Sequence, residues 1–310
     1  MICTNTSFYG FDFTSFLYPY NVKAALKVND VKRIGGYINY INQYKLDQAV
    51  ISLPSIDMIR SCPSLRFLRI HPPMDSPNNY DFTPLYDHDR ITALSVVTRY
   101  GVNDKYLGDI DFSKIKGLES LSFGVTKRTV NYTDIPTLKS LLIGGYKACD
   151  INELFSSKIL DTLELNSCSI ESLDGIENSN KIQCVTIIYN RKLKDISALE
   201  RVRGSLRALN IEYCAQITDF SVIEKLENLE KLFIRGSTPI SNLDFVKRMK
   251  NLKTLILDVP IISGDITPCL KLQYASVGGD RRHYNLKNRD LPKGLRVLGN
   301  EDIDVYRRLE

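Results

Sequence analysis

The feature of the sequence that most constrains its fold is a triplet of apolar residues that recurs along most of the chain. Five central copies begin at residues 160, 182, 206, 229 and 252, and each has an apolar residue at its first, fourth and sixth positions. The same spacing continues in both directions, which gives thirteen starts between residues 23 and 295 at a mean interval of about 23 residues. One such triplet arises readily by chance, whereas thirteen at a near-constant interval indicate repeated copies of one structural unit.

Each copy has the pattern of a strand followed by a helical turn. Leu163 and Leu165 flank Glu164, so that two side chains face one side of an extended chain and the third faces the other. The following segment spaces its apolar residues by three or four, as at Ile217 and Phe220, which is typical of a helix. A single unit cannot bury its own apolar face, so stacked copies are expected to form an α/β solenoid with a parallel sheet on one side and helices on the other.

The ninth position of a copy is also distinctive. It holds a polar or thiol residue in four central copies, namely Cys168, Asn190, Cys214 and Ser237. Such a side chain can bond the backbone groups of the turn after the strand. Tyr146, Pro260 and Asp280 take this position in other copies, and there we expect distorted turns.

The triplets and the ninth position together resemble the leucine-rich repeat family over residues 23–300, with a mixture of its 22-residue and cysteine-containing subtypes. The resemblance implies a curved parallel β-sheet on a concave side and helices or helical turns on a convex side. The resemblance also implies that the protein binds a partner on the concave face and does not catalyse a reaction. The whole chain then divides into an aromatic-rich N-terminal cap at 1–22, a solenoid at 23–300 with a loop insertion at 71–90, and a tail at 301–310.

Composition narrows the cellular setting. The 310 residues carry a net charge of only +5, which is too small and too dispersed for a dedicated nucleic-acid binder. No apolar stretch approaches the roughly 18 residues that a membrane span needs, and the N-terminus lacks the pattern of a signal peptide. The seven cysteines include no CxxC pair, which favours a reducing compartment. We therefore expect a cytoplasmic monomer with no membrane association.

The sequence offers no clear site for a metal, a cofactor or catalysis. His71 and His88 fall in the 71–90 insertion beside several aspartates, but no second histidine stands at ligand spacing, so we expect a solvated loop and no metal. Cys168 and Cys214 lie two repeats apart, about 10 Å at the usual strand spacing, which is too far for a disulfide or a shared metal. The chain has none of the common hydrolase, phosphate-loop or dinucleotide-binding motifs. We expect a non-enzyme without cofactors.

A candidate binding surface follows from the strand pattern. Positions three, five, seven and eight of each copy are expected to face away from the core. In the central copies the predicted protein-binding residues at these positions are Tyr189, Glu212, Tyr213, Phe233, Arg235, Ile256 and Asp258. Exposed aromatic residues and arginine dominate the energetics of protein interfaces. The alternative is that the tyrosines only pack on each other and the charged residues form surface ion pairs worth at most about 1 kcal/mol each.

The expected function is a non-catalytic scaffold that binds a protein partner on the concave face. An adaptor that recruits an enzyme and a bacterial antagonist, such as a toxin-neutralising immunity protein or a secreted effector, would use the same surface. RNA binding through residues 278–290, which contain Arg281, Arg282, His283, Lys287 and Arg289, is the alternative from another class. The candidate surface is not basic, however, and phosphate binding requires several aligned cations.

Overall fold

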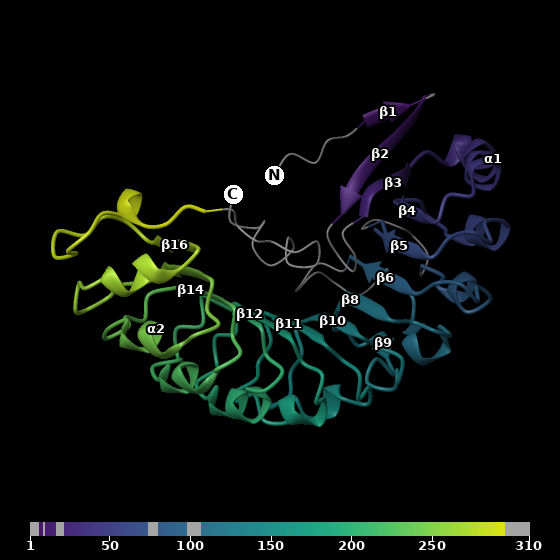
Figure 1. Ribbon diagram of the computed structural model, residues 1–310. Helices are drawn as coiled ribbons and strands as arrows, with labels where there is room; N and C mark the ends of the chain where they lie inside the picture. Colours follow the sequence, from purple (N-terminus) through teal and green to yellow (C-terminus); the bar gives the residue numbers. More distant parts are fainter. Residues whose placement is uncertain (1–5, 9, 17–21, 74–79, 98–106, 295–310) are drawn as a thin grey trace. The chain divides into compact units, whose positions relative to one another are not determined.

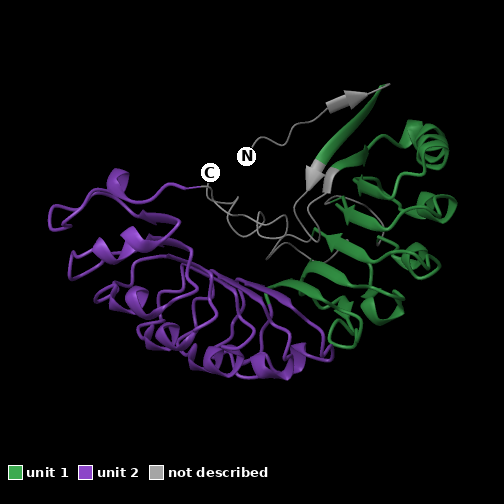
Figure 2. Cartoon of the chain, viewed as in Figure 1, with its two compact units in different colours: residues 1–145, 298–310 green, residues 146–297 purple. Residues whose placement is uncertain are grey.

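A computed structural model describes residues 6–8, 10–16, 22–73, 80–97 and 107–294 (Figure 1). The chain divides into two compact units, residues 1–145 with 298–310 and residues 146–297 (Figure 2). The tail expected at 301–310 lies outside the described residues. No helix of the described residues is long and apolar enough to cross a membrane.

The sheet of the first unit begins with two antiparallel pairs and continues as a parallel sheet. Its strands, in spatial order, are β1 (Thr6–Phe8), β2 (Phe11–Phe16), β3 (Val22–Val28), β4 (Gln48–Ile51), β5 (Phe67–Ile70), β6 (Ala93–Val96), β8 (Ser120–Gly124) and β10 (Ser140–Gly144). A small second sheet pairs β7 (Ile110–Asp111) with β9 (Thr129–Val130). The helical elements are α1 (Ile34–Tyr44) and the 3₁₀ helices η1 (Val31–Arg33), η2 (Asp57–Ser61), η3 (Thr83–Leu85) and η5 (Phe112–Lys114).

The second unit contains the central repeats, each built from one strand and one helical turn. Its parallel strands are β11 (Thr162–Asn166), β12 (Cys184–Ile188), β13 (Ala208–Glu212), β14 (Lys231–Arg235), β15 (Thr254–Asp258) and β16 (Tyr274–Val277). The helical elements are η6 (Asn152–Leu154), η7 (Ile176–Asn178), η8 (Ser197–Val202), η9 (Ser221–Lys225), α2 (Asp244–Arg248), η10 (Thr267–Lys271) and η11 (Asn288–Asp290). Helical turns cover one face of this sheet (Figure 2), and we call the other face the open face.

The apolar triplets set the register of the strands, as predicted. Leu163, Val185, Leu209 and Leu232 are direct neighbours on successive strands, and none has exposed surface. A one-residue slip would move each of them to the opposite face, so the buried side fixes the alignment. Burying one such side chain contributes about 1.5–3 kcal/mol, and the repetition builds a continuous core.

Both ends of the repeat array carry segments that differ from a repeat. In the region expected to be an N-terminal cap, the Phe11 ring lies 4.3 Å from the ring of Tyr40 in α1. After β16, the Tyr284 hydroxyl accepts the Ile261 N–H at 3.0 Å, and the Pro292 carbonyl accepts the Ala275 N–H at 2.9 Å. Residues 278–294 thus satisfy one backbone group of the edge strand β16 and one of the segment that follows β15.

The expected solvated loop at 71–90 is wrong for its described second half. Tyr80, Phe82 and Leu85 are buried, and η3 lies within this stretch. His88 is also buried, and its Nε2 lies 3.1 Å from the Cys62 carbonyl. The aromatic and aliphatic residues of this stretch supply the buried side of a helical turn, a role that its proline and asparagine content obscured.

Candidate functional site

Two stacked tyrosines mark the carboxyl ends of β12 and β13. Tyr189 and Tyr213 directly follow these strands, and their ring centroids lie 4.9 Å apart with an interplanar angle of 5°. Both side chains stay exposed, at 49% and 42%. Offset aromatic pairs of this kind contribute about 0.5–1.5 kcal/mol beyond the area they bury. The sequence-predicted adjacency of these residues at position eight is therefore present in the structure.

The backbone of both tyrosines is left-handed, with φ of 54° at Tyr189 and 52° at Tyr213. This conformation costs an L-residue about 1–2 kcal/mol, and it is an outlier for a bulky side chain. Ser167 and Gly279 occupy the same repeat position with φ of 53° and 71°, so the turn itself imposes the geometry. Retaining two tyrosines where glycine is favoured suggests a function for the exposed rings.

Arg235 lies beside the tyrosines and is held by two carboxylates. Its guanidinium is 3.1 Å from Asp258 and 3.7 Å from Glu212. The same group lies over the rings of Tyr213 and Phe233, at 6.0 and 5.4 Å from their centroids. These contacts fix the orientation of a long side chain that would otherwise sample many rotamers.

Not all predicted residues are on the surface. Phe233 has no exposed surface and Glu212 only 5%, whereas Ile256 is half-buried. The expectation that Phe233 is exposed is wrong, because its neighbours in the register are Asn210 and Ile256 and Arg235 lies over its ring. Ile188 is at position seven of its copy, which was expected to face away from the core, and it is also buried, at 3%. The exposed part of the site is thus Tyr189, Tyr213, Asp258 and the partly exposed Arg235.

The ninth position behaves in two ways. Asn190 is fully buried, and its side chain bonds the Cys168 N–H and the carbonyls of Leu165 and Ile188. Ser237 was also expected to bond the backbone groups of its turn, but its side chain is exposed. This expectation is therefore wrong: Gly236 has a φ of 157°, a conformation that L-residues rarely adopt, and the turn after β14 takes a different path.

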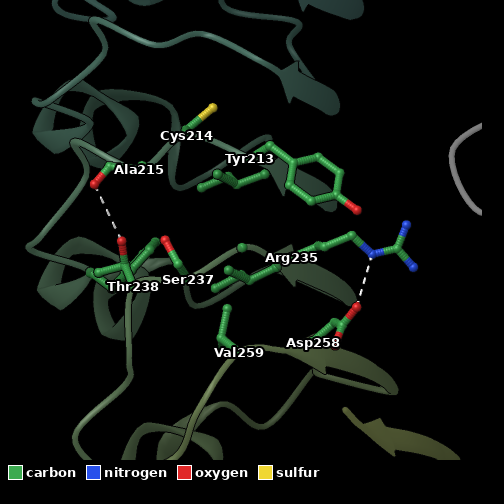
Figure 3. A pocket seen from close by; sticks show the side chains of 12 residues that line it. Tyr213, Cys214, Ala215, Arg235, Ser237, Thr238, Asp258 and Val259 are labelled. Carbon is green, nitrogen blue, oxygen red and sulfur yellow. Dashed lines mark hydrogen bonds and ion pairs between the residues drawn. The ribbon is translucent and has the colours of Figure 1, made fainter.

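A groove opens beside Ser237, next to the stacked tyrosines (Figure 3). Its volume is about 340 Å³, and Ile211, Phe220, Ile234 and Val259 line its apolar part. Tyr213, Arg235 and Asp258 also line it, so three predicted site residues border one groove. The sequence reasoning missed this groove. The available signal was the Gly236–Pro239 segment, in which the sequence Gly-Ser-Thr-Pro replaces the cysteine-containing or asparagine-containing turn of the neighbouring repeats.

The site has no metal-binding cluster. Among the described residues, no group of three or more histidine, cysteine, aspartate or glutamate side chains is placed to hold a metal ion. Cys168 and Cys214 are buried free thiols. The Cys214 Sγ instead lies 3.3 Å from the Glu212 carbonyl, so this thiol contacts the backbone of the turn that follows β13.

Thiol labelling checks this assignment of the cysteines. Of the described cysteines, we expect Cys149 alone to react within minutes at about pH 8, because it is exposed and the thiolate is the reactive form. Burial raises the pKa of Cys62 and Cys214 to about 11 and the pKa of Cys184 and Cys269 to about 12. Mass spectrometry of the labelled native protein measures the modified positions. Rapid modification of Cys214 would contradict the burial of its thiol.

The fold is that of a leucine-rich repeat solenoid, which confirms the resemblance seen in the sequence. The structure of an internalin from Listeria monocytogenes is similar, with a TM-score of 0.55 and 18% identity over 83% of this chain and 74% of the internalin. A leucine-rich repeat protein from Leptospira interrogans aligns with a TM-score of 0.49 and 13% identity over 83% of this chain and 72% of that protein. No family model and no curated protein sequence matches the chain. Identities this low establish the fold alone.

Proposed function

We propose that the protein is a non-catalytic scaffold that binds a protein partner at the carboxyl ends of strands β12–β15. The contact surface consists of Tyr189, Tyr213, Arg235, Asp258 and the adjoining groove, and we call it the tyrosine surface. The observation that carries the proposal is the pair of stacked, exposed tyrosines held in left-handed backbone conformations. A turn that serves only the fold gains little from these residues, because the left-handed backbone cost of about 1–2 kcal/mol offsets the stacking and serine or glycine meets the same backbone requirement.

The chemistry of the tyrosine surface suits recognition. Aromatic residues and arginine are enriched among the residues that dominate binding energy. The stack and the ion pairs immobilise Tyr213 and Arg235 before a partner arrives, which lowers the entropy cost of association. The carboxylates of Glu212 and Asp258 both contact Arg235, so they hold a cation in place and are not arranged as an acid–base pair. Leucine-rich repeat structures are generally binding scaffolds, which also supports this proposal.

The cellular role follows from the partner. An adaptor would bind an enzyme of its own cell on the tyrosine surface, and a bacterial antagonist would bind a toxin or a host protein there. We propose a monomer in a reducing, cytoplasmic compartment, since the described cysteines are free thiols and four of them are buried. The identity of a captured partner separates the two roles.

Affinity capture with a double variant tests the proposal. Tyr189→Ser with Tyr213→Ser removes both rings but installs the residue that the chain itself carries at Ser167 with the same φ. Quantitative mass spectrometry should show a protein captured by the wild type from native extract and reduced at least about 10-fold with the double variant. Tyr44→Ser is the matched control, because Tyr44 is a similarly exposed tyrosine in α1. A partner captured equally by all three proteins would exclude the tyrosine surface as its binding site.

A further inference from the structure

Position nine carries a hydrogen-bond ladder from one repeat to the next. Asn190 accepts the Cys168 N–H at 2.8 Å and donates to the Leu165 carbonyl at 2.8 Å. One repeat later the Cys214 thiol takes the same place: it accepts the Asn190 N–H and lies 3.9 Å from the Ile187 carbonyl. The N–H groups of Cys168 and Asn190 are thus each met by the position-nine side chain of the following repeat, as buried backbone donors require.

The ladder ends at Ser237. Because Ser237 is exposed, no side chain of its repeat replaces the asparagine, and within the described part of the chain the Cys214 N–H has no acceptor. The groove lies at this place, and Cys214 and Ile211 both line it. The Ile211 carbonyl corresponds by register to the Leu165 carbonyl that Asn190 bonds. Both residues whose backbone groups an asparagine would satisfy therefore line the groove.

We propose that this groove binds the side-chain amide of an asparagine or glutamine carried by an extended, basic segment of the protein partner. This inference rests on the proposed function and specifies the chemistry of the partner. The amide oxygen accepts the Cys214 N–H and the amide nitrogen donates to the Ile211 carbonyl, as Asn190 does in the preceding part of the ladder. The volume of about 340 Å³ is at the lower end for small-ligand pockets and suits a side chain better than a cofactor.

The charges around the groove select against an acid at this position. Glu212 and Asp258 supply two carboxylates to the single guanidinium of Arg235, so this cluster has a surplus of one negative charge. A carboxylate from the partner would meet this surplus and could not donate to the Ile211 carbonyl. A lysine or arginine beside the amide would instead face the exposed Asp258, whose side chain is 53% exposed. Charge complementarity therefore favours a basic segment.

Synthetic peptides test the predicted chemistry directly. The probes are four matched sets of acetylated, amidated nonapeptides whose central residue is Asn, Gln, Asp or Ala, with one flanking lysine and otherwise mixed composition. Fluorescence anisotropy should show that the Asn or Gln set binds at least about 10-fold more tightly than both the Asp and the Ala sets, because an unpaired polar group is costly in such a site. Equal binding of all four sets, or no binding of any, would overturn the proposal.

Two variants test the place of binding. Ser237→Asn offers the chain its own ladder asparagine, and Ala215→Phe places a large ring at an exposed position that lines the groove. Both variants should weaken binding of the amide peptides at least about 10-fold. Ala215→Phe should do so even if the side chain introduced by Ser237→Asn stays outside the groove. Tyr44→Ser is again the matched control: Tyr44 belongs to α1 and is not among the residues that line the groove, so this variant should bind the peptides as the wild type does.

Hydrogen exchange reports on the ladder without any ligand. In the wild type, the Cys214 N–H should exchange at least about 100-fold faster than the Cys168 N–H, which is bonded to Asn190. Equal protection of the two N–H groups would overturn the proposal.

Other outcomes separate this inference from the proposed function. A captured partner whose binding requires the tyrosines but is unchanged by both groove variants would leave the proposed function intact and refute the amide site. A wild-type dimer that Ser237→Asn converts to a monomer would assign the groove to a second copy of the chain and also refute it.

Discussion

Replacing Asn190 with alanine is expected to lower the free energy of unfolding by about 3–4 kcal/mol. The Asn190 side chain is fully buried and makes three hydrogen bonds, to the Cys168 N–H and to the carbonyls of Leu165 and Ile188. Alanine removes all three and leaves a buried N–H without an acceptor. It also leaves a cavity between two repeats, where each unit depends on its neighbour for stability.

Ser237→Ala is the matched control, because it changes the same repeat position two copies later. Ser237 is exposed and outside the ladder, so its loss should change the free energy of unfolding by less than about 0.5 kcal/mol. Denaturation followed by circular dichroism compares the two variants with the wild type. Equal destabilisation by both changes would show that the ladder continues through Ser237.

The sequence could predict the register and core of the repeats because both follow from a local pattern. Leu209 and Leu232 are paired and buried because period-two alternation within each strand and a common spacing between strands leave one alignment that buries every triplet. The same pattern placed Tyr189 and Tyr213 next to each other.

The remaining features depend on neighbours that no local pattern encodes. Phe233 is at a position that faces away from the helices, yet its exposure is decided by Asn210 and Ile256 on flanking strands and by Arg235 over its ring. Ser237 is chemically suited to the ladder, but the backbone path through Gly236 decides whether it enters. The groove arises from this unfilled place, so residue types alone could not reveal it.

Tyr213→Gly and Tyr213→Ala are expected to weaken partner binding strongly and to differ from each other in stability. Each removes an aromatic side chain that is 42% exposed and stacked on Tyr189, and we expect binding to weaken about 30- to 1,000-fold, the usual effect of losing a dominant interface residue. Glycine also relieves the left-handed strain at φ of 52°, whereas alanine retains it. The glycine variant should therefore be more stable than the alanine variant by about 1 kcal/mol and close to the wild type, because strain relief offsets the lost stacking.

Comparing the two substitutions separates recognition from folding. Titration calorimetry with the captured partner measures binding, and thermal unfolding measures stability. If the tyrosine serves the fold, both variants should lose stability in proportion to the lost ring contacts, with the partner still bound. If it serves recognition, binding is lost in both variants, and only the alanine variant is clearly destabilised. The second outcome follows from a ring held in an unfavourable backbone conformation with much of its surface exposed to solvent.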